Sequence, residues 1–254
     1  MRIRARIAGL LAAVLAAGAL TIVTFAGPAS AAAMELRVVT ANLAFRQAPG
    51  VRQDWTKIGP YADIVFFQEA KNVRLADVLG DGWIVRQDTS AEDRQGSAVA
   101  IRRALAAEIV DFELVKGTDG ASCGGEPIMT RWITKLRLRL TNGRPVRLAS
   151  LHMPPPRCQS GPGSPYAVMA DNVVEFANRS DVLTILGADW NKIVDQDPNE
   201  IGARTGLKPR GPNSGLRIDG FYVSPAITTR DVRHLEQTGS DHRPVQMHVG
   251  IPTA

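Results

Sequence analysis

Cysteine and histidine are scarce in this chain, with two and four in 254 residues, and their scarcity excludes several kinds of site. No group of them has the spacing of a structural or catalytic zinc site. The sequence also lacks the G-x-x-x-x-G-K loop with which many nucleotide-binding proteins hold phosphates. Internal repeats, heptads and domain-splitting linkers are absent as well. Any chemistry therefore depends on residues that lie far apart in the sequence.

Residues 1–33 are typical of a secretory signal peptide. Three arginines lie within the first six residues, an apolar run follows from Ile7 to Ala26, and small residues near the end offer A-x-A cleavage sites. An uncleaved membrane anchor is the alternative, because the apolar run is long enough to span a bilayer. We expect cleavage near residues 31–33 and a secreted product in which residues 34–254 form one domain.

The net charge says little about the partner once the leader is removed. The formal charge falls from +5 to +2, because the leader contains three arginines and no acidic residue. Such a small excess is weak support for a polyanionic ligand. Evidence for nucleic acid must therefore come from particular residues.

The two cysteines, Cys123 and Cys158, are predicted to form a disulfide. A secreted protein with two cysteines usually pairs them. Residues 132–140 and 145–152 read as strands joined by a turn at Asn142-Gly143, and both cysteines fall beyond the open end of that hairpin. Two free thiols are the alternative interpretation.

Strand-like runs dominate the rest of the chain. Several are almost continuously apolar, which indicates strands covered on both faces. The runs are residues 36–42, 63–69, 97–103, 108–115, 132–140, 145–152, 181–191, 217–224 and 243–249. Helices are predicted near 51–59, over 165–178 after the N-cap Ser164, and over 197–206 with Asp197 as the cap. The pattern predicts a single α/β domain of the sandwich type.

Six of these strands carry a polar or charged residue at or near one end. Each has an ordinary structural interpretation as a turn residue, a cap, an ion pair or a solvated strand end. The coincidence of all six favours a site, whose candidate members are Asn42, Glu69, His152, Asp189, Asn191, Asp219, Asp241 and His242.

The chemistry that this set supports is metal-assisted hydrolysis of a phosphate ester. Carboxylate oxygens such as those of Glu69 and Asp241 are hard ligands that suit Mg²⁺ or Mn²⁺, with Ca²⁺ a further candidate. A serine hydrolase is the other interpretation of Ser240-Asp241-His242. It is disfavoured, because adjacent residues on an extended chain point in different directions.

The motifs "TAN", "FFQEA", "LH", "GADWN", "RIDGFYVS" and "SDHRPV" follow one another from about Leu36 to Val249. In this order the sequence resembles the endonuclease/exonuclease/phosphatase superfamily, which has the deoxyribonuclease-like fold. The resemblance implies a four-layer α/β sandwich, with two face-to-face mixed β-sheets flanked by helices. The sequence departs from the family at Ala188, where Gly is usual, and at Gly220, where an aromatic residue is frequent. The missing side chain at Gly220 predicts a wider pocket.

The resemblance also implies a role for each polar residue. Glu69, Asn42 and Asp241 correspond to the metal environment. Asp189 and His242 are the two candidates for the general base, with Asp219 fixing the tautomer of His242. Asn191 and His152 would donate hydrogen bonds to the phosphoryl oxygens.

The substrate is the least constrained feature. Basic residues in rim loops favour a nuclease acting on extracellular DNA. The assigned substrate-binding residues are Arg157, Lys192 and Arg243, with Arg46, Arg204, Lys208 and Arg210 as further rim candidates. A sphingomyelinase-like phospholipase C, another phosphoesterase and a catalytically silent binding module are the alternatives. We expect a monomer without a stable protein partner.

Overall fold

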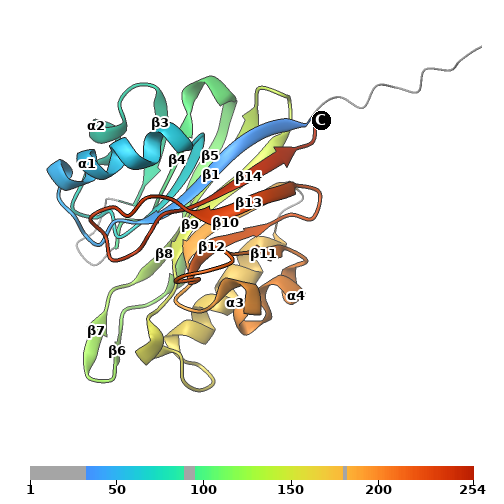
Figure 1. Cartoon of the computed structure of the whole chain (residues 1–254). Coiled ribbons are helices and arrows are strands. Elements are labelled where there is room, and N and C mark those ends of the chain that lie inside the picture. Colours follow the sequence, from blue (N-terminus) through green and yellow to red (C-terminus); the bar gives the residue numbers. More distant parts are fainter. Residues whose placement is uncertain (1–32, 89–94, 180–181) are drawn as a thin grey trace, which may run out of the picture. The chain divides into compact units, whose positions relative to one another are not determined.

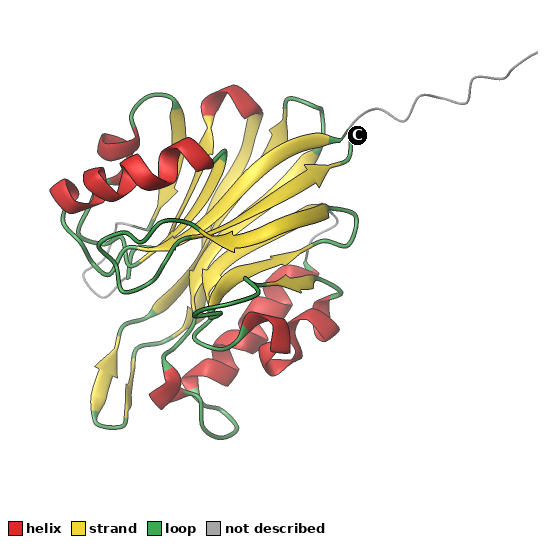
Figure 2. Ribbon diagram, viewed as in Figure 1, coloured by secondary structure: helices red, strands yellow, loops and turns green. Residues whose placement is uncertain are grey.

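The structure is a computed structural model that describes residues 33–88, 95–179 and 182–254 (Figures 1 and 2). The predicted leader lies outside these residues except for Ala33, so its cleavage stays a prediction. The described residues belong to one unit, Ala31–Ala254. None of the described helices is both long enough and apolar enough to cross a bilayer.

Two six-stranded mixed sheets form the centre of this unit (Figure 2). The first contains, in spatial order, β13 (Thr228–His234), β14 (Val245–Ile251), β1 (Met34–Asn42), β2 (Ile64–Gln68), β4 (Ala98–Arg102) and β3 (Trp83–Gln87). The second contains β11 (Lys208–Arg210), β12 (Asp219–Val223), β10 (Leu183–Asp189), β9 (Pro145–His152), β8 (Arg131–Leu140) and β5 (Ala106–Thr118). In each sheet one central pair is parallel, β1 with β2 and β9 with β10.

Helices cover the outer faces of both sheets (Figure 1). Helices α1 (Ala48–Ile58) and α2 (Leu75–Leu79) pack on the first sheet, and α3 (Pro165–Asn178) and α4 (Ile201–Thr205) pack on the second. Short 3₁₀ turns are η1 (Gly59–Tyr61), η2 (Arg103–Leu105), η3 (Pro156–Cys158), η4 (Val194–Gln196) and η5 (Pro198–Glu200). The predicted four-layer α/β sandwich is therefore confirmed.

Alternation along the strands explains the apolar runs. In β1, Val38 faces the core between the sheets, whereas Val39 faces the layer of α1 and α2. Both side chains are fully buried. Because successive side chains point to opposite faces, a strand buried on both faces has to be apolar almost throughout.

The two sheets pack closely near the site. A side chain on Gly187 of β10 would place its Cβ 2.3 Å from the ring of Phe66 on β2, so glycine is required there. The side-chain amide of Gln68, at the end of β2, donates to Ser150 Oγ (3.1 Å) on β9 in the other sheet. This contact ties the two sheets together directly beneath the strand ends that carry the polar residues.

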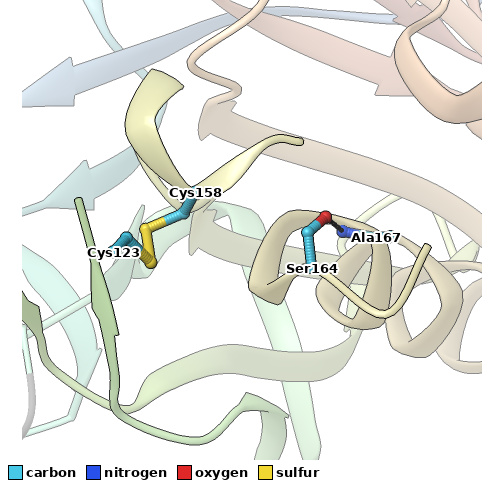
Figure 3. The surroundings of a disulfide bond; sticks show 4 residues. All are labelled: Cys123, Cys158, Ser164 and Ala167. Carbon is cyan, nitrogen blue, oxygen red and sulfur yellow. Dashed lines mark hydrogen bonds between the residues drawn. A yellow bond between two sulfur atoms is a disulfide. The ribbon is translucent and has the colours of Figure 1, made fainter. Parts of the chain in front are cut away.

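The predicted hairpin and disulfide are both present. The turn between β8 and β9 has Gly143 at φ 84°, and Asn142 Oδ1 accepts a hydrogen bond from Arg144 N. A separate two-stranded hairpin, β6 (Ala121–Cys123) and β7 (Glu126–Ile128), is joined to η3 by the Cys123–Cys158 disulfide (Figure 3).

The two predicted helix starts have different outcomes. Ser164 caps α3 as expected, since its Oγ accepts from Ala167 N (Figure 3). The continuous helix predicted over 197–206 is wrong, because Asn199 and Glu200 both have φ 56° and interrupt it. The Asp197 carboxylate instead accepts from the amides of residues 202 and 203 in α4. Asp197 is therefore a cap, but for a helix that begins four residues later.

Candidate active site

The polar strand ends meet at one edge of the sandwich. Parallel pairing brings the carboxyl ends of β1 and β2 together in one sheet and those of β9 and β10 together in the other. Asp189 is the register partner of His152 on one side and of Asp219 on the other. His152, Asp189 and Asp219 thereby lie in one row, although 67 positions of the sequence separate the first from the last.

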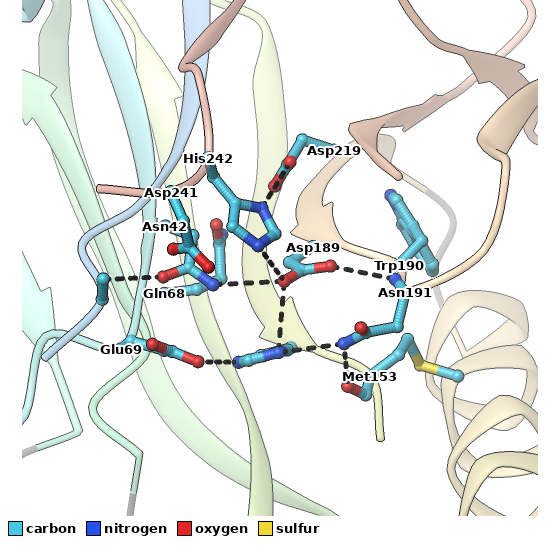
Figure 4. A network of polar contacts seen from close by, with 12 residues as sticks. Asn42, Gln68, Glu69, Met153, Asp189, Trp190, Asn191, Asp219, Asp241 and His242 are labelled. Atoms are coloured by element: carbon cyan, nitrogen blue, oxygen red, sulfur yellow. Dashed lines mark hydrogen bonds and ion pairs between the residues drawn. The ribbon is translucent and has the colours of Figure 1, made fainter. Parts of the chain in front are cut away.

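His242 is held by Asp219. Its Nδ1 lies 2.7 Å from Asp219 Oδ2, and the Asp219 side chain is 2% exposed. A carboxylate accepts only, so this bond puts the ring proton on Nδ1 and turns Nε2 toward Asp189, whose Oδ2 is 3.8 Å away (Figure 4). The predicted pairing of His242 with Asp219 is present in this geometry.

Asp189 lies at the centre of the network in Figure 4. Its Oδ1 accepts from Asn191 N (2.9 Å), and its Oδ2 accepts from Asn42 Nδ2 (3.1 Å) and lies 3.2 Å from His152 Nε2. The side-chain nitrogen of Asn191, Nδ2, is 3.1 Å from His152 Nε2 and also donates to Met153 O. These contacts hold three of the predicted residues around one carboxylate.

Electrostatics separate the two candidate bases. Burial acts to raise the pKa of Asp189, but the charge and hydrogen bond of His152, with His242 and the Asn191 amide, lower it to about 2. Burial acts to lower the pKa of His242, but the hydrogen bond and charge of Asp219, helped by Asp189 and Asp241, raise it to about 9. At neutral pH the Asp189 carboxylate is ionised and the His242 imidazole carries a proton.

Four residues at this site have backbone in the left-handed region. Glu69 and Asn191 have φ of 55° and 51°, and Ala44 and Phe45, which follow Asn42, have φ of 48° and 54°. A residue with a side chain in this left-handed region costs on the order of 1 kcal/mol or more. Such strain persists where the surrounding structure demands it, and here it sets the direction of Glu69 and Asn191.

The three predicted metal ligands lie on one side of the network. Figure 4 shows Glu69, Asn42 and Asp241 on the side away from Asn191. Glu69 is partly buried, and among the described residues its carboxylate has no Lys or Arg partner; its ion-pair contact is with His152 Nδ1 at 3.6 Å. A partly buried carboxylate without a cation, beside an exposed carboxylate and an amide oxygen, fits a hard divalent ion.

A second group of possible ligands lies deeper. Ligand atoms of Asp189, Asp219 and His242 are within 4.8 Å of one another. Their strongest mutual contact is the 2.7 Å bond between His242 Nδ1 and Asp219, which occupies both groups. This bond leaves Asp219 and His242 less available to a metal ion than the Glu69 carboxylate.

A cavity of about 300 Å³ opens onto these groups. Besides predicted residues, its wall contains several that the sequence did not single out. These are Phe45, Gln95, Pro127, Ile128, Met129, Arg131 and Pro155. Pro127 and Ile128 belong to the disulfide-linked hairpin, with Met129 just after it, and Arg131 begins β8, so the hairpin forms one wall of the site.

The three predicted substrate-binding residues have separate positions. Arg157 lines the cavity and is exposed. Lys192 Nζ is 3.1 Å from Asn199 Oδ1 and 4.3 Å from the ring centre of Tyr166, and Arg243 donates two hydrogen bonds to Leu235 O. The described lining of the cavity includes neither Lys192 nor Arg243.

Other rim arginines are engaged in the scaffold. Arg46 pairs with Asp54, Arg204 with Asp171 and Arg210 with Thr229. Lys208 is exposed on β11.

The predicted widening of the pocket at Gly220 is wrong. A Cβ at Gly220 would lie 2.6 Å from Arg210 O and 3.1 Å from Val194 Cγ2, so the missing side chain makes room for β11 and not for a substrate. The ring N–H of Trp190 also donates to Gly220 O (3.1 Å) at this position.

A nucleophilic serine has no support in this geometry. Residues 120–124 match the G-x-S-x-G pattern, but Ser122 lies in the β6–β7 hairpin and not at a turn from a strand into a helix. Ser240 Oγ accepts from His242 N, so it supports the loop that carries the histidine.

Residues 36–242 match the model of the Endonuclease/Exonuclease/phosphatase family. The chain belongs to this family. Its members are phosphoesterases, which agrees with the carboxylate, amide and imidazole groups at the strand ends. A search of curated protein sequences found no match to this chain.

Solved structures with this fold show the same architecture at low identity. TDP2 of D. rerio, complexed with a single-strand DNA product, has a TM-score of 0.57 at 15% identity over 85% of this chain and 99% of its own. ANGEL2, a 2′,3′-cyclic phosphatase, has a TM-score of 0.61 at 10% identity over 86% and 96%. A family protein from Leptotrichia buccalis has a TM-score of 0.58 at 16% identity over 85% and 100%. At these identities the similarity establishes the fold.

Proposed function

We propose that this protein is a secreted, divalent-metal-dependent phosphodiesterase that cleaves DNA as an endonuclease. The observation that carries the proposal is the juxtaposition, at one cavity, of an ionised Asp189, a protonated His242 and a Glu69 carboxylate that has no Lys or Arg ion-pair partner among the described residues. Hydrolysis of a phosphodiester needs a group to orient water, a donor for the leaving oxygen and neutralisation of phosphoryl charge. Each need has a matching group here.

We assign Asp189 to orienting and deprotonating the attacking water, because it is ionised and held by three neighbours. His242 is the proton donor, with Asp219 holding its ring. His152 and Asn191 donate to the phosphoryl oxygens. A Mg²⁺ ion held by Glu69, Asn42 and Asp241 would supply charge neutralisation, with Mn²⁺ or Ca²⁺ as alternatives.

Cationic residues around the cavity support a nucleic acid. Arg131 and Arg157 line it, and Lys71 lies beside it, with Nζ 5.4 Å from the ring centre of Phe45. The D. rerio structure contains a DNA product on a related scaffold, which favours the same class of substrate. A lipid substrate would favour an apolar projection, whereas the tip of the β6–β7 hairpin is Gly124-Gly125 followed by an exposed Glu126.

The secreted location rests on the leader and on the disulfide. Cys123–Cys158 is a bond that persists in oxidising compartments. A catalytically silent module is disfavoured, because every predicted polar group is retained in an ordered network.

The test is nicking of supercoiled plasmid by residues 34–254, with Mg²⁺ or with excess EDTA. His242→Ala should abolish nicking, whereas His248→Ala, which alters a histidine on β14 outside the site, should leave it unchanged. Nicking that needs both metal and His242 would support the proposal. Absence of nicking with every divalent metal would refute DNA endonuclease activity and direct the assays to phospholipids and small phosphate esters.

A further inference from the structure

Asp54 is a buried carboxylate that the proposed chemistry does not use. The buried positions of α1 are Val51, Asp54 and Ile58, which have the spacing of an apolar helix face, so a charged residue stands where the pattern predicts an apolar one. Its side chain is 3% exposed, and the described lining of the cavity does not include it. A buried charge destabilises a fold unless it has partners, so the partners of Asp54 explain its place.

The partners of Asp54 come from two different loops. Its Oδ1 accepts a hydrogen bond from Gly239 N (2.9 Å), in the loop between β13 and β14. Its Oδ2 lies 3.2 Å from Arg46 Nε, in the turn that follows β1. The two loops also touch each other, because a Cβ at Gly239 would lie 1.0 Å from Arg46 Nη1. One carboxylate on α1 therefore binds both loops where they meet.

The turn after β1 belongs to the metal side of the site. Ala44 N donates to Asn42 Oδ1 (2.8 Å), and Phe45 N donates to Glu69 O (3.1 Å). Arg46 follows directly in the chain. A displacement of Arg46 would therefore reach Asn42 and Glu69, which belong to the predicted metal environment.

The loop that contains Gly239 carries the proton donor, since His242 follows three positions later. Asn42 and His242 both belong to the network in Figure 4. The described ladder between β1 and β14 ends at the pair Thr40–Val245, short of both residues. Backbone pairing of these two strands therefore does not set the separation of Asn42 from His242, and the contacts of Asp54 lie beyond the reach of the ladder.

We propose that Asp54 is a positioning residue that joins the turn of Arg46 to the loop of Gly239 and thereby sets the separation of the metal environment from His242. This inference rests on the proposed phosphodiesterase function. Catalytic groups act only when they are held in the reacting geometry, and a misplacement of about 1 Å lowers a rate by roughly 100-fold. Asp54 acts through the two loops and outside the cavity lining, so its loss should lower kcat and leave KM nearly unchanged.

The test compares Asp54→Leu and Asp54→Asn with wild type by steady-state hydrolysis of a phosphodiester and by thermal unfolding. Leucine restores the apolar helix face, and water can hydrate the released groups, because Gly239 is exposed and Arg46 is partly exposed. We therefore expect Asp54→Leu to unfold within a few degrees of wild type, while its kcat falls roughly 10- to 100-fold. Asparagine keeps an acceptor for Gly239 N but loses the charge that pairs with Arg46, so its kcat should fall less.

Asp77→Asn is the matched control, because Asp77 forms an exposed pair with Arg74 at the start of α2, and this variant should behave as wild type. Hydrogen–deuterium exchange over residues 236–242 supplies a second readout. It should become faster in Asp54→Leu, while exchange of the sheet strands stays unchanged. If the kcat of Asp54→Leu stays within about threefold of wild type, or if its loss only follows the unfolded fraction, the proposal is overturned.

The remaining outcomes also decide the role of Asp54. If Asp54→Leu does not fold, the test passes to Asp54→Asn, which keeps the size of the side chain, and a wild-type kcat in that variant would overturn the proposal. If wild type hydrolyses no phosphodiester, the proposed function fails, and exchange alone tests the link between the loops. Faster exchange over residues 236–242 in the variants would retain that link, whereas unchanged exchange would overturn it.

Discussion

Asp219→Asn isolates the hydrogen bond that holds His242 without changing the size of the side chain. In the structure the carboxylate accepts from Nδ1 at 2.7 Å and fixes the proton on that nitrogen. An amide can donate as well as accept, so the variant allows the opposite tautomer. The ring is then free to rotate away from Asp189.

The size of the effect follows from the bond and from the tautomer. A hydrogen bond to a charged group contributes about 1.5–3 kcal/mol, which corresponds to roughly 10- to 150-fold in rate. A wrong tautomer adds to this loss, and an analogous change in a Ser-His-Asp triad costs on the order of 10⁴-fold. We therefore expect kcat to fall by about 10²- to 10⁴-fold.

The stability of the fold should change far less than the activity. Burial and the charge of Asp189 raise the pKa of Asp219 to about 7, against the opposing bond from His242. A carboxyl group whose pKa is raised on folding destabilises the fold as the pH rises through that value, and a neutral amide removes this cost. Against the effect of burial, the same bond raises the pKa of His242 to about 9 and so stabilises the fold at the assay pH, and its loss offsets this gain. The thermal midpoint of the variant should therefore change little.

The assay is steady-state hydrolysis of a phosphodiester beside thermal unfolding at pH 7.5. Asp231→Asn is the matched control, because Asp231 lies 3.8 Å from His248 Nδ1 in an exposed Asp–His pair outside the site. Retention of more than a tenth of wild-type kcat, or a loss of activity together with several degrees of thermal stability, would refute the assigned role of Asp219.

Three further predictions concern the metal, the disulfide and acid stability. EDTA should abolish hydrolysis and added Mg²⁺ should restore it. The ion should also raise the thermal midpoint, because it adds about 2.7 kcal/mol to the free energy of unfolding at 100 times its Kd. The double variant with Cys123→Ser and Cys158→Ser lacks the bridge between residues 35 positions apart. Chemical unfolding should show that the free energy of unfolding falls by up to about 4 kcal/mol, and KM should rise more than kcat falls. Asp63→Asn should lower the free energy of unfolding by about 2 kcal/mol at pH 7. Burial acts to raise the pKa of Asp63, but the hydrogen bonds from Arg37 and the charge of Arg102 lower it overall, so the ionised carboxylate stabilises the fold. That cost should persist above about pH 4 and vanish as the pH falls below it, and a pH-independent difference would contradict the ion-pair explanation.

The fold was largely predictable because a strand that is buried on both faces is apolar along almost its whole length, and such runs can be recognised in the sequence. The run at 64–68 is apolar except for its last residue, and it forms the central strand β2. Edge strands lack this signal. Strand β13 (Thr228–His234) is polar and mostly exposed, and β11 has three residues, so neither was predicted. Their pairing with β14 and β12 comes from the sheet and not from their own sequence.

The candidate site was predictable where a motif includes a strand end. Asp189 and His152 could be assigned because each directly follows an apolar run, and parallel pairing then makes them register partners. Rim residues carried no such signal. For Lys192 and Arg243 the sequence offers only their charge, and in the structure both bind neighbours outside the cavity lining.

Arg131 shows why the remaining part was not predictable from sequence. In "RWITKLRLRL" it is one of four basic residues that alternate with apolar ones, and the pattern gives no reason to prefer it to Lys135, Arg137 or Arg139. Lys135 and Arg139 pair with acidic residues of β5 across the strand, because β5 runs beside them. Arg131 is the first residue of β8, where its partner Thr118 is the last residue of β5 and the disulfide-linked hairpin connects the two strands. The topology thus leaves one arginine of the row facing the cavity. Which basic residue of β8 belongs to the site therefore depends on the partners that β5 offers along the strand.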